Sequence, residues 1–165
     1  LLNFINHLLL LYLPNQLYGI SPMLSKNFEH TVRFYEHRAN GNSTWLPLVN
    51  VTLITPTDNR ISLSLLFDTG ASVTTLRADL YQMLGLQSWD QGHRVCTATG
   101  GGTVAAYIYT TTLEVFGKTI QCPIQLLQLP NHPLFSGLLG RDIVFKEFGF
   151  GFWENVNELY VTTNP

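Results

Sequence analysis

The sequence is poor in charge. Only 12% of its 165 residues are Asp, Glu, Lys or Arg, and the net charge is −2. The nine Lys and Arg residues form no cluster, so the sequence lacks the basic surface that nucleic-acid binding requires, and we expect no nucleic-acid partner. Hydrophobic residues make up 45% of the chain, which is enough for a single globular domain with a substantial core.

Metal ligands and cofactor motifs are also scarce. Cys96 and Cys122 belong to no Cys-x-x-Cys pair, which argues against a structural zinc site and a disulfide-rich scaffold. We favour two buried thiols over a disulfide. The five His residues show neither a His-Glu-x-x-His motif nor ligand spacing, so no metal is expected. Gly-Lys-Ser/Thr does not follow the glycines at 100–102, so no nucleotide cofactor is expected either.

Long apolar runs are missing. Leu8 to Leu13 is an unbroken apolar run, but a membrane span needs about 20 residues. The run suits a signal-peptide core, although no initiator Met, basic segment or clear cleavage site accompanies it. We expect residues 1–28 to be a leader, either a trimmed signal or anchor or a poorly ordered N-terminal segment, and 29–165 to be the folded domain. Localisation stays open, and no membrane contact is expected apart from such an anchor.

Short alternating segments rich in β-branched and aromatic residues predict strands along most of the chain. The expected strands are 30–37, 47–55, 61–67, two arms within 93–109, 110–117, 118–129, 138–139, 148–153 and 158–163. Residues 39–45 are expected to form a turn. A helix is predicted at 76–86, with Gly85 as its left-handed cap, and a short one at 141–146. The fold class is therefore all-β with one or two short helices.

One acidic residue lies at a notable place in this β-rich chain. Asp68 follows directly after the strand expected at 61–67. Gly70 lets the backbone turn so that main-chain N–H groups point at the carboxylate, and Thr69 and Ser72 add hydroxyls. An ordinary Asx turn would explain a bare Asp-Thr-Gly. The apolar flanks favour an ordered, partly desolvated carboxylate of the kind found at catalytic sites.

The segment LLFDTGASVTTL resembles the signature of the retropepsin-like aspartic proteases, which is an apolar strand, Asp-Thr/Ser-Gly-Ala/Ser and a second apolar strand. A second element, GLLGRDIVF at 137–145, has the form that the family shows late in its domain. Between them, the Gly-rich hairpin at 93–109 lies where the family carries its flap. The resemblance covers roughly residues 30–163. It implies an acid-protease fold, a closed β-barrel with a flap hairpin.

The same resemblance implies an aspartic endopeptidase that hydrolyses peptide or protein substrates as a homodimer. Such hydrolysis needs two adjacent carboxylates that share a proton, and this chain has one Asp-Thr-Gly, so Asp68 of each subunit would activate the water. The residues implied to support the catalytic loop are Thr69, Gly70, Ala71 and Ser72. Those implied at the flap tip, which meets substrate, are Gly100, Gly101 and Gly102. Those implied under the active site are Leu138, Leu139, Gly140, Arg141 and Asp142.

One position departs from the retroviral members, and two other interpretations stay open. Retroviral members have an acidic residue where this chain has Ser72, so Arg141 lacks its usual partner, which favours a cellular or bacterial type. The first alternative is a non-catalytic dimerisation or peptide-binding module, since fold does not fix function. The second is a ligand-binding barrel with an incidental Asp turn, which requires Leu-Leu-Gly-Arg-Asp to be a coincidence. The intact Asp-Thr-Gly and the Gly-rich hairpin favour the protease.

Overall fold

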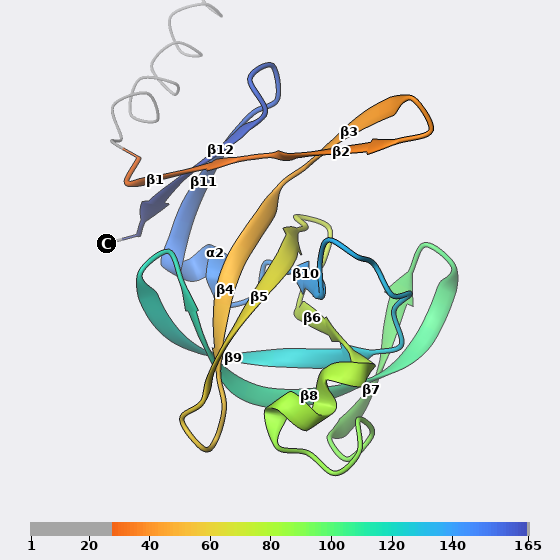
Figure 1. Cartoon of the computed structure of the whole chain (residues 1–165). Coiled ribbons are helices and arrows are strands. Elements are labelled where there is room, and N and C mark those ends of the chain that lie inside the picture. Colours follow the sequence, from red (N-terminus) through yellow and green to blue (C-terminus); the bar gives the residue numbers. More distant parts are fainter. Residues whose placement is uncertain (1–27, 165) are drawn as a thin grey trace, which may run out of the picture.

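Strands dominate the computed structural model, which describes residues 28–164; all of the expected leader except Phe28 lies outside the described residues. Figure 1 shows the strands with two short helical segments among them. The strands are β1 (His30–Arg33), β2 (Tyr35–Ala39), β3 (Asn42–Leu46), β4 (Leu48–Ile54), β5 (Arg60–Phe67), β6 (Thr74–Arg77), β7 (His93–Thr99), β8 (Gly102–Val115), β9 (Lys118–Leu127), β10 (Gly137–Leu139), β11 (Phe148–Trp153) and β12 (Glu158–Thr163). The helical segments are the 3-10 helix η1 (Ala78–Leu84) and α2 (Val144–Glu147). The all-β prediction is confirmed.

Six strands close into a ring, in the order β4-β5-β10-β6-β9-β8 and back to β4. The closing contact is the antiparallel pairing of β4 with β8, from Thr52 opposite Glu114 to Ile54 opposite Thr112. Most pairs are antiparallel, but β10 runs parallel to β5 and β9 runs parallel to β6. β7 extends the sheet beyond β8 and forms a long hairpin with it. A closed ring leaves few unpaired edges, which suits a small all-β domain.

Alternating side chains fill the interior of the ring. In β5, Leu63, Leu65 and Phe67 are buried, while the residues between them are more exposed. The same alternation runs through β4 and the second half of β8, because successive side chains of a strand point to opposite faces of a sheet. In β6 and at the end of β9, successive residues are buried, so both faces of the sheet are covered there. The largest fully buried side chains are Phe148, Leu53, Leu65, Leu76, Leu113, Ile124, Leu126, Leu139, Leu159, Val49, Val51 and Val115.

A second, three-stranded sheet joins the two ends of the described chain, in the order β1-β12-β11. Aromatic side chains pack this end sheet against the closed ring of strands. Phe67, the last residue of β5, has its ring centroid 5.4 Å from that of Phe145, 4.7 Å from Phe150 and 5.5 Å from Phe152. Aromatic pairs at these separations favour fixed packing geometries. The residue before Asp68 is therefore anchored to the end sheet.

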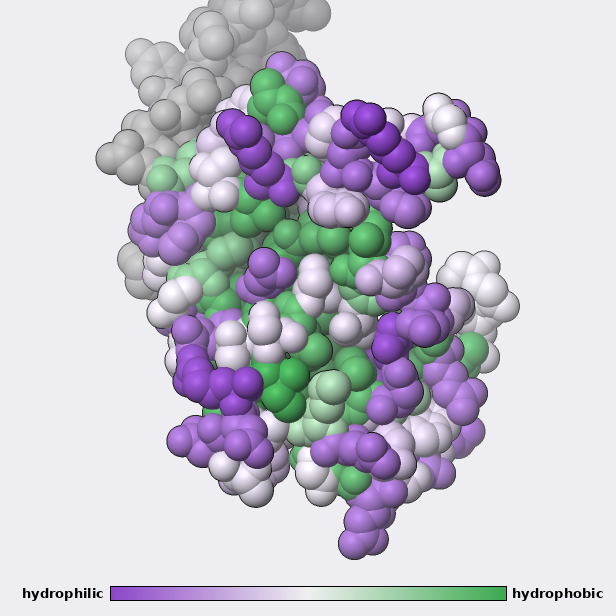
Figure 2. Space-filling model, viewed as in Figure 1, coloured by the Kyte–Doolittle hydropathy of each residue, from purple (hydrophilic) through white to green (hydrophobic). Residues whose placement is uncertain are grey.

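A projecting hairpin, β2–β3, replaces the turn expected at 39–45. Only Asn40 and Gly41 turn, with φ angles of 52° and 77°, and the next five residues form β3, paired with β2. Asn-Gly accepts positive φ at both positions, so a two-residue turn suffices and the residues after it can pair. Figure 1 shows this hairpin extending away from the ring, and Figure 2 shows hydrophobic residues in the hollow between the two.

Other boundaries also differ from the sequence prediction. The strand expected at 30–37 breaks at Phe34, which is buried and donates its N–H to Asn157 O. The two strands expected within 102–117 are one continuous strand, β8, which ends at the turn of Phe116 and Gly117. The first half of β8 pairs mainly with β7, and its second half pairs with β4 and β9, so no break is needed.

The two expected helices form but are shorter than predicted, and α2 ends one residue later than expected, at Glu147. Residues 74–77 are strand β6, so η1 is shorter than the helix predicted at 76–86; Gly85 caps it in the left-handed region, at φ 73°. Residues 141–143 are a turn before α2. Over the described residues, no helix is long and apolar enough to cross a membrane.

Both cysteines are free, and only one has the burial expected of it. Cys122 is buried, but Cys96 is exposed, so the expectation of two buried thiols was wrong for Cys96. The reason is that Val95 and Thr97 are half-buried, so strand alternation places Cys96, between them, on the exposed face of β7.

Candidate active site

Asp68 lies at the point where β5 leaves the ring. Leu63, Leu65 and Phe67 point into the core, so strand alternation places Leu66 and Asp68 on the opposite face. The Asp68 side chain is half-buried. Its Oδ1 accepts the N–H of Gly70 at 2.8 Å, and the Ala71 N–H donates to the Asp68 carbonyl oxygen at 3.2 Å. The predicted hydrogen bond from the backbone to the carboxylate is thus present.

The glycine at position 70 leaves room for the Asp68 carboxylate in this tight turn. A Cβ at Gly70 would lie 3.1 Å from Asp68 Oδ1, closer than most such contacts. Thr69, Gly70 and Ser72 are exposed, while Ala71 is half-buried. The loop therefore presents its outer surface to solvent and keeps its inner side against the protein.

The end of β10 and the segment after it hold the inner side of this loop. Leu139 O accepts the Asp68 N–H at 3.1 Å. The N–H of Arg141 donates to Ala71 O at 2.9 Å, and the N–H of Asp142 donates to Ser72 O at 3.0 Å. Three main-chain hydrogen bonds thus join the Asp68 loop to a segment far along the chain, and each contributes roughly 1 kcal/mol.

Gly140 lies at the closest approach of the two segments. Its N–H donates to Thr74 Oγ1 at 3.2 Å. A Cβ at this position would lie 2.5 Å from the carbonyl carbon of Val73, so only glycine fits. The sequence pattern Leu-Leu-Gly therefore has a steric reason: the glycine lets the two main chains touch.

The five residues expected under the site lie beside the Asp68 loop, but some of them contact it through the main chain and not through the side chain. Leu139 is fully buried, whereas Leu138 is half-buried and pairs with Leu66 and Thr75, which places it on the face of Asp68. The side chain of Arg141 is exposed, and the hydrogen bond that joins it to the loop comes from its main chain. The lack of an acidic partner at Ser72 therefore leaves the contact between the two segments intact.

The Gly-rich hairpin forms where the sequence predicts it. β7 and β8 pair from His93 opposite Ile108 to Thr99 opposite Gly102. Gly100 and Gly101 form the turn, and Gly102 begins β8 with φ 118°. All three glycines are exposed. The tip is held internally by the hydroxyl of Thr99, which donates to Gly102 O at 2.8 Å.

Sequence reasoning missed the polar residues on the face that Asp68 shares. Thr75 and Gln125 are opposite each other on β6 and β9 and are both buried. The hydroxyl of Thr97, on β7, donates to Gln125 Oε1 at 2.7 Å, so one arm of the hairpin lies over this face. A polar residue in the apolar run from Ile124 to Leu127 is a sequence signal that could have revealed Gln125.

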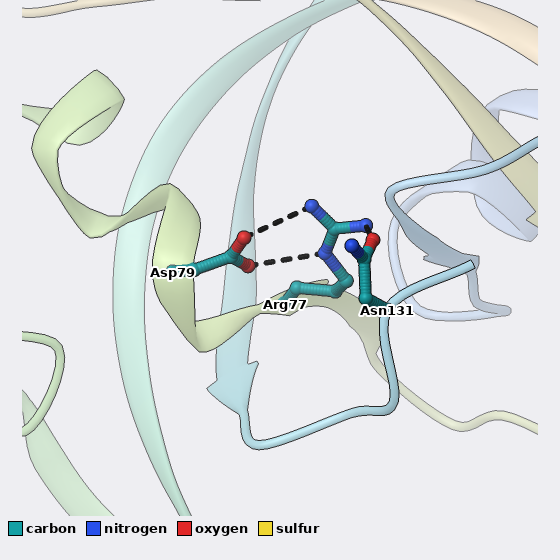
Figure 3. Close-up of polar contacts among 3 residues, drawn as sticks. All are labelled: Arg77, Asp79 and Asn131. Carbon is teal, nitrogen blue, oxygen red and sulfur yellow. Dashed lines mark hydrogen bonds and ion pairs between the residues drawn. The ribbon is translucent and has the colours of Figure 1, made fainter. Parts of the chain in front are cut away.

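A second missed group holds the loop 128–136, which connects β9 to β10. Figure 3 shows the guanidinium of Arg77 between Asp79 and Asn131. It makes two hydrogen bonds to the Asp79 carboxylate, at 3.0 and 2.9 Å, and a further one to Asn131 Oδ1. Arg77 also donates its main-chain N–H to Ser136 O at 3.1 Å, so it contacts the loop both at Asn131 and at its last residue.

Two cavities flank Arg77. One, of about 290 Å³, is lined by residues that include Tyr81 and Trp89. The other, of about 230 Å³, is lined by residues that include Phe135 and Leu138. Because Leu138 shares the face of Asp68, the second cavity adjoins the candidate site.

Thiol and metal chemistry find little support near Asp68. Burial, with a smaller effect of the Asp142 carboxylate, raises the pKa of Cys122 to about 11, so its thiol stays protonated at neutral pH and is a poor nucleophile. Among residues 28–164, no group of three or more His, Cys, Asp or Glu side chains could hold a metal ion.

Comparison with protein families agrees with the resemblance seen in the sequence. The family model described as aspartyl protease matches residues 54–143, which is more than half of the chain. A solved structure of EIAV protease, complexed with the inhibitor HBY-793, is 23% identical, with a TM-score of 0.46, and the match covers 67% of this chain and 93% of that one. The search of curated proteins found no match. The family match includes both Asp-Thr-Gly and Leu-Leu-Gly-Arg-Asp, and from it we conclude that this chain belongs to the aspartyl protease family, a family of hydrolases.

Proposed function

We propose that this chain is an aspartic endopeptidase that acts as a homodimer, with Asp68 of each copy in the catalytic pair. The observation that carries the proposal is the geometry of the Asp-Thr-Gly loop. Its carboxylate is held by the Gly70 N–H at 2.8 Å, and its inner side is joined to residues 139–142, at and after the end of β10, by three main-chain hydrogen bonds. A carboxylate fixed in this way at the surface of a rigid fold is suited to catalysis.

The need for two carboxylates supports the dimer. The chain contains Asp-Thr-Gly once, and this hydrolysis uses two acids that share one proton. Thr69 and Gly70 are exposed, so the loop is open to an identical loop across a two-fold axis. In the proposed dimer, Thr69 contacts the partner loop and stiffens the pair.

The proposed reaction uses the two carboxyl groups as base and acid. The ionised Asp68 takes a proton from a water molecule, whose oxygen attacks the peptide carbonyl carbon. The protonated Asp68 of the other copy donates its proton to the carbonyl oxygen. The resulting diol then collapses, the C–N bond breaks and the leaving nitrogen receives a proton, which yields a carboxyl and an amine product.

The other predicted site residues have supporting roles in this proposal. Thr69, Gly70, Ala71 and Ser72 shape the loop. The floor is made by Leu138, Leu139, Gly140, Arg141 and Asp142. The N–H groups of Gly100, Gly101 and Gly102 meet the substrate main chain by strand addition, since all three glycines are exposed at the hairpin tip. The substrate is an extended peptide that lies between this tip and Asp68.

We also propose that the catalytic domain comprises residues 29–165, as expected from the sequence. The pairing of β1 with β12 supports this, because it ties His30–Arg33 to the end sheet. Phe28, next to the predicted boundary, packs on Trp153 and Tyr160, with centroids 6.1 and 5.4 Å away, so the first described residues contact the end sheet.

The test compares the wild type with Asp68→Asn on a mixed peptide library, read by mass spectrometry from about pH 4 to pH 7. We expect cleavage by the wild type only, with both proteins folded and equally dimeric by analytical ultracentrifugation. Asp58→Asn is the matched control, because Asp58 is an exposed turn residue at φ 61°, which Asn tolerates. Cleavage that survives Asp68→Asn would refute the role of Asp68. A dimeric wild type that cleaves nothing would instead favour a peptide-binding module.

A further inference from the structure

A chain of buried hydrogen bonds crosses the sheet beside the candidate site. The Thr97 hydroxyl donates to Gln125 Oε1 at 2.7 Å, and Gln125 Nε2 donates to Thr75 Oγ1 at 2.7 Å. The Thr75 hydroxyl in turn donates to Val73 O at 3.1 Å. Gln125 is only 6% exposed and Thr75 only 2%, so water does not compete freely for these groups.

Along this network of hydrogen bonds, each donor points from Thr97 toward Val73. A threonine hydroxyl has one proton, and Thr75 uses its proton on Val73 O. Thr75 must therefore accept from Gln125, which fixes the Gln125 N–H toward Thr75 and its carbonyl oxygen toward Thr97. With the Gln125 amide turned over, its N–H would point at the Thr97 hydroxyl, which can accept, but its Oε1 would face the Thr75 oxygen with no proton between them, because Thr75 gives its proton to Val73 O. The network thus has a single fully satisfied arrangement.

The two ends of the network lie in the two parts of the proposed site. At one end, Val73 directly follows the loop of residues 68–72. Its carbonyl carbon packs against Gly140 so closely that a Cβ on Gly140 would lie only 2.5 Å from it. At the other end, Thr97 lies on β7, close to the glycines of the hairpin tip. Within residues 28–164, the Thr97–Gln125 contact is the side-chain hydrogen bond that joins β7 to a strand other than β8.

We propose that Gln125 is a positioning residue that couples the seating of the Gly-rich hairpin to the order of the Asp68 loop. The inference rests on the proposed function, in which the hairpin closes over peptide. When β7 lies against the sheet, Gln125 is fully hydrogen-bonded and Thr75 supports Val73. When β7 lifts, Gln125 Oε1 loses its partner, the amide is free to turn, and the support of Val73 weakens. An unpaired buried acceptor is unfavourable, so the network favours the seated hairpin.

The first test perturbs the hairpin and measures the loop. Hydrogen exchange of the Gly70 and Ala71 amides, resolved by NMR, reports on the loop because both amides bond to Asp68. Thr97→Val should speed their exchange about fivefold, the equivalent of one net hydrogen bond. Thr97→Ser keeps a hydroxyl and should restore the wild-type rate. Thr111→Val is the matched control, since it removes a buried hydroxyl from β8 outside the network and should change nothing at these amides.

The second test runs in the opposite direction. Coupling between two sites is reciprocal, so Thr75→Val should increase the conformational exchange of the Gly101 amide, measured by relaxation dispersion. Gln125→Leu should produce both effects together. If Gln125→Leu fails to fold, the two threonine variants still decide the question. Unchanged Gly70 and Ala71 exchange in Thr97→Val would overturn the proposal.

These measurements are independent of activity. If the coupling is seen but the wild-type dimer cleaves no peptide, the network stands and the proposed protease function fails. If the wild type cleaves peptides, Thr97→Val should lower kcat more than it raises KM, because a disordered loop impairs chemistry more than binding. If Thr97→Val cleaves peptides with unaltered kcat, the proposed protease function stands but the positioning role of Gln125 is refuted.

Discussion

Replacing Gly140 by alanine is a direct test of how the Asp68 loop is held. A Cβ at this position would lie 2.5 Å from the carbonyl carbon of Val73 and 2.8 Å from the nitrogen of Thr74. Ordinary van der Waals contact begins at 3.4 Å, so the two segments must separate by about 0.9 Å. The atoms that clash belong to the main chain, so no change of rotamer relieves the contact.

This separation breaks the two hydrogen bonds that follow Gly140 along the chain. The bonds from Arg141 to Ala71 and from Asp142 to Ser72 are 2.9 and 3.0 Å long, and stretching each by about 0.9 Å takes both beyond hydrogen-bond range. Their loss amounts to about 2 kcal/mol. Overpacking adds about 1–3 kcal/mol, so Gly140→Ala should lower the free energy of unfolding by about 3–5 kcal/mol.

Thermal unfolding followed by circular dichroism measures this loss. For a domain of this size, we expect Tm to fall by about 10–20 °C. Gly100→Ala is the matched control, because nothing lies within 4 Å of a Cβ there and its Tm should stay within about 2 °C of wild type. A Gly140→Ala protein that melts with the wild type and cleaves peptide normally would show that the two segments are not in the close contact described.

Three further predictions follow from the thiols and from Arg77. Cys96 is exposed and should react with a maleimide in the native protein, whereas Cys122 should react only after unfolding in guanidinium, as labelling and mass spectrometry would show; equal labelling would contradict the burial of Cys122. Burial raises the pKa of Cys122 from 9.0 to about 11, so its stabilising effect is complete below pH 9.0 and is lost toward pH 11. As the pH rises between those values, the free energy of unfolding of Cys122→Ala, measured by chemical denaturation, should fall less than that of the wild type. An equal fall in the two proteins would argue against the raised pKa of Cys122. Arg77→Ala removes the ion pair with Asp79 and should lower stability by about 1 kcal/mol and speed limited proteolysis in loop 128–136; an unchanged cleavage rate would show that Arg77 does not hold the loop.

Most strands could be predicted from the sequence, because alternation of buried and exposed residues is a local signal. The bounds of β11 and β12 agree with the prediction, and those of β5 differ by one residue. The break at Phe34 could not be predicted, because it depends on a main-chain partner, Asn157, far along the chain. The continuity of β8 was hidden for the same reason, since its neighbours change from β7 to β4 along its length.

The candidate site was predictable where it depends on short motifs. Asp68, Gly70 and Gly140 lie in two such motifs, and the structure brings those motifs into contact. The resemblance placed Arg141 under the site without its usual partner; its contact with the loop is made by its main chain, which residue type does not encode. Gln125 was missed because its partners come from two other strands, which only the strand register brings together.

The contact between the Asp68 loop and the segment after β10 has a consequence for synthesis on the ribosome. β4 and β5 form a hairpin from neighbouring sequence, so they can pair early as the chain emerges. The floor of the loop comes from Leu139 to Asp142, which are translated long after Asp68. A nascent or truncated chain that stops before Leu139 therefore displays Asp-Thr-Gly without the main-chain contacts that fix it. Under the proposed function, the carboxylate stays unordered until the late strand is released, which delays proteolytic activity until the fold is nearly complete.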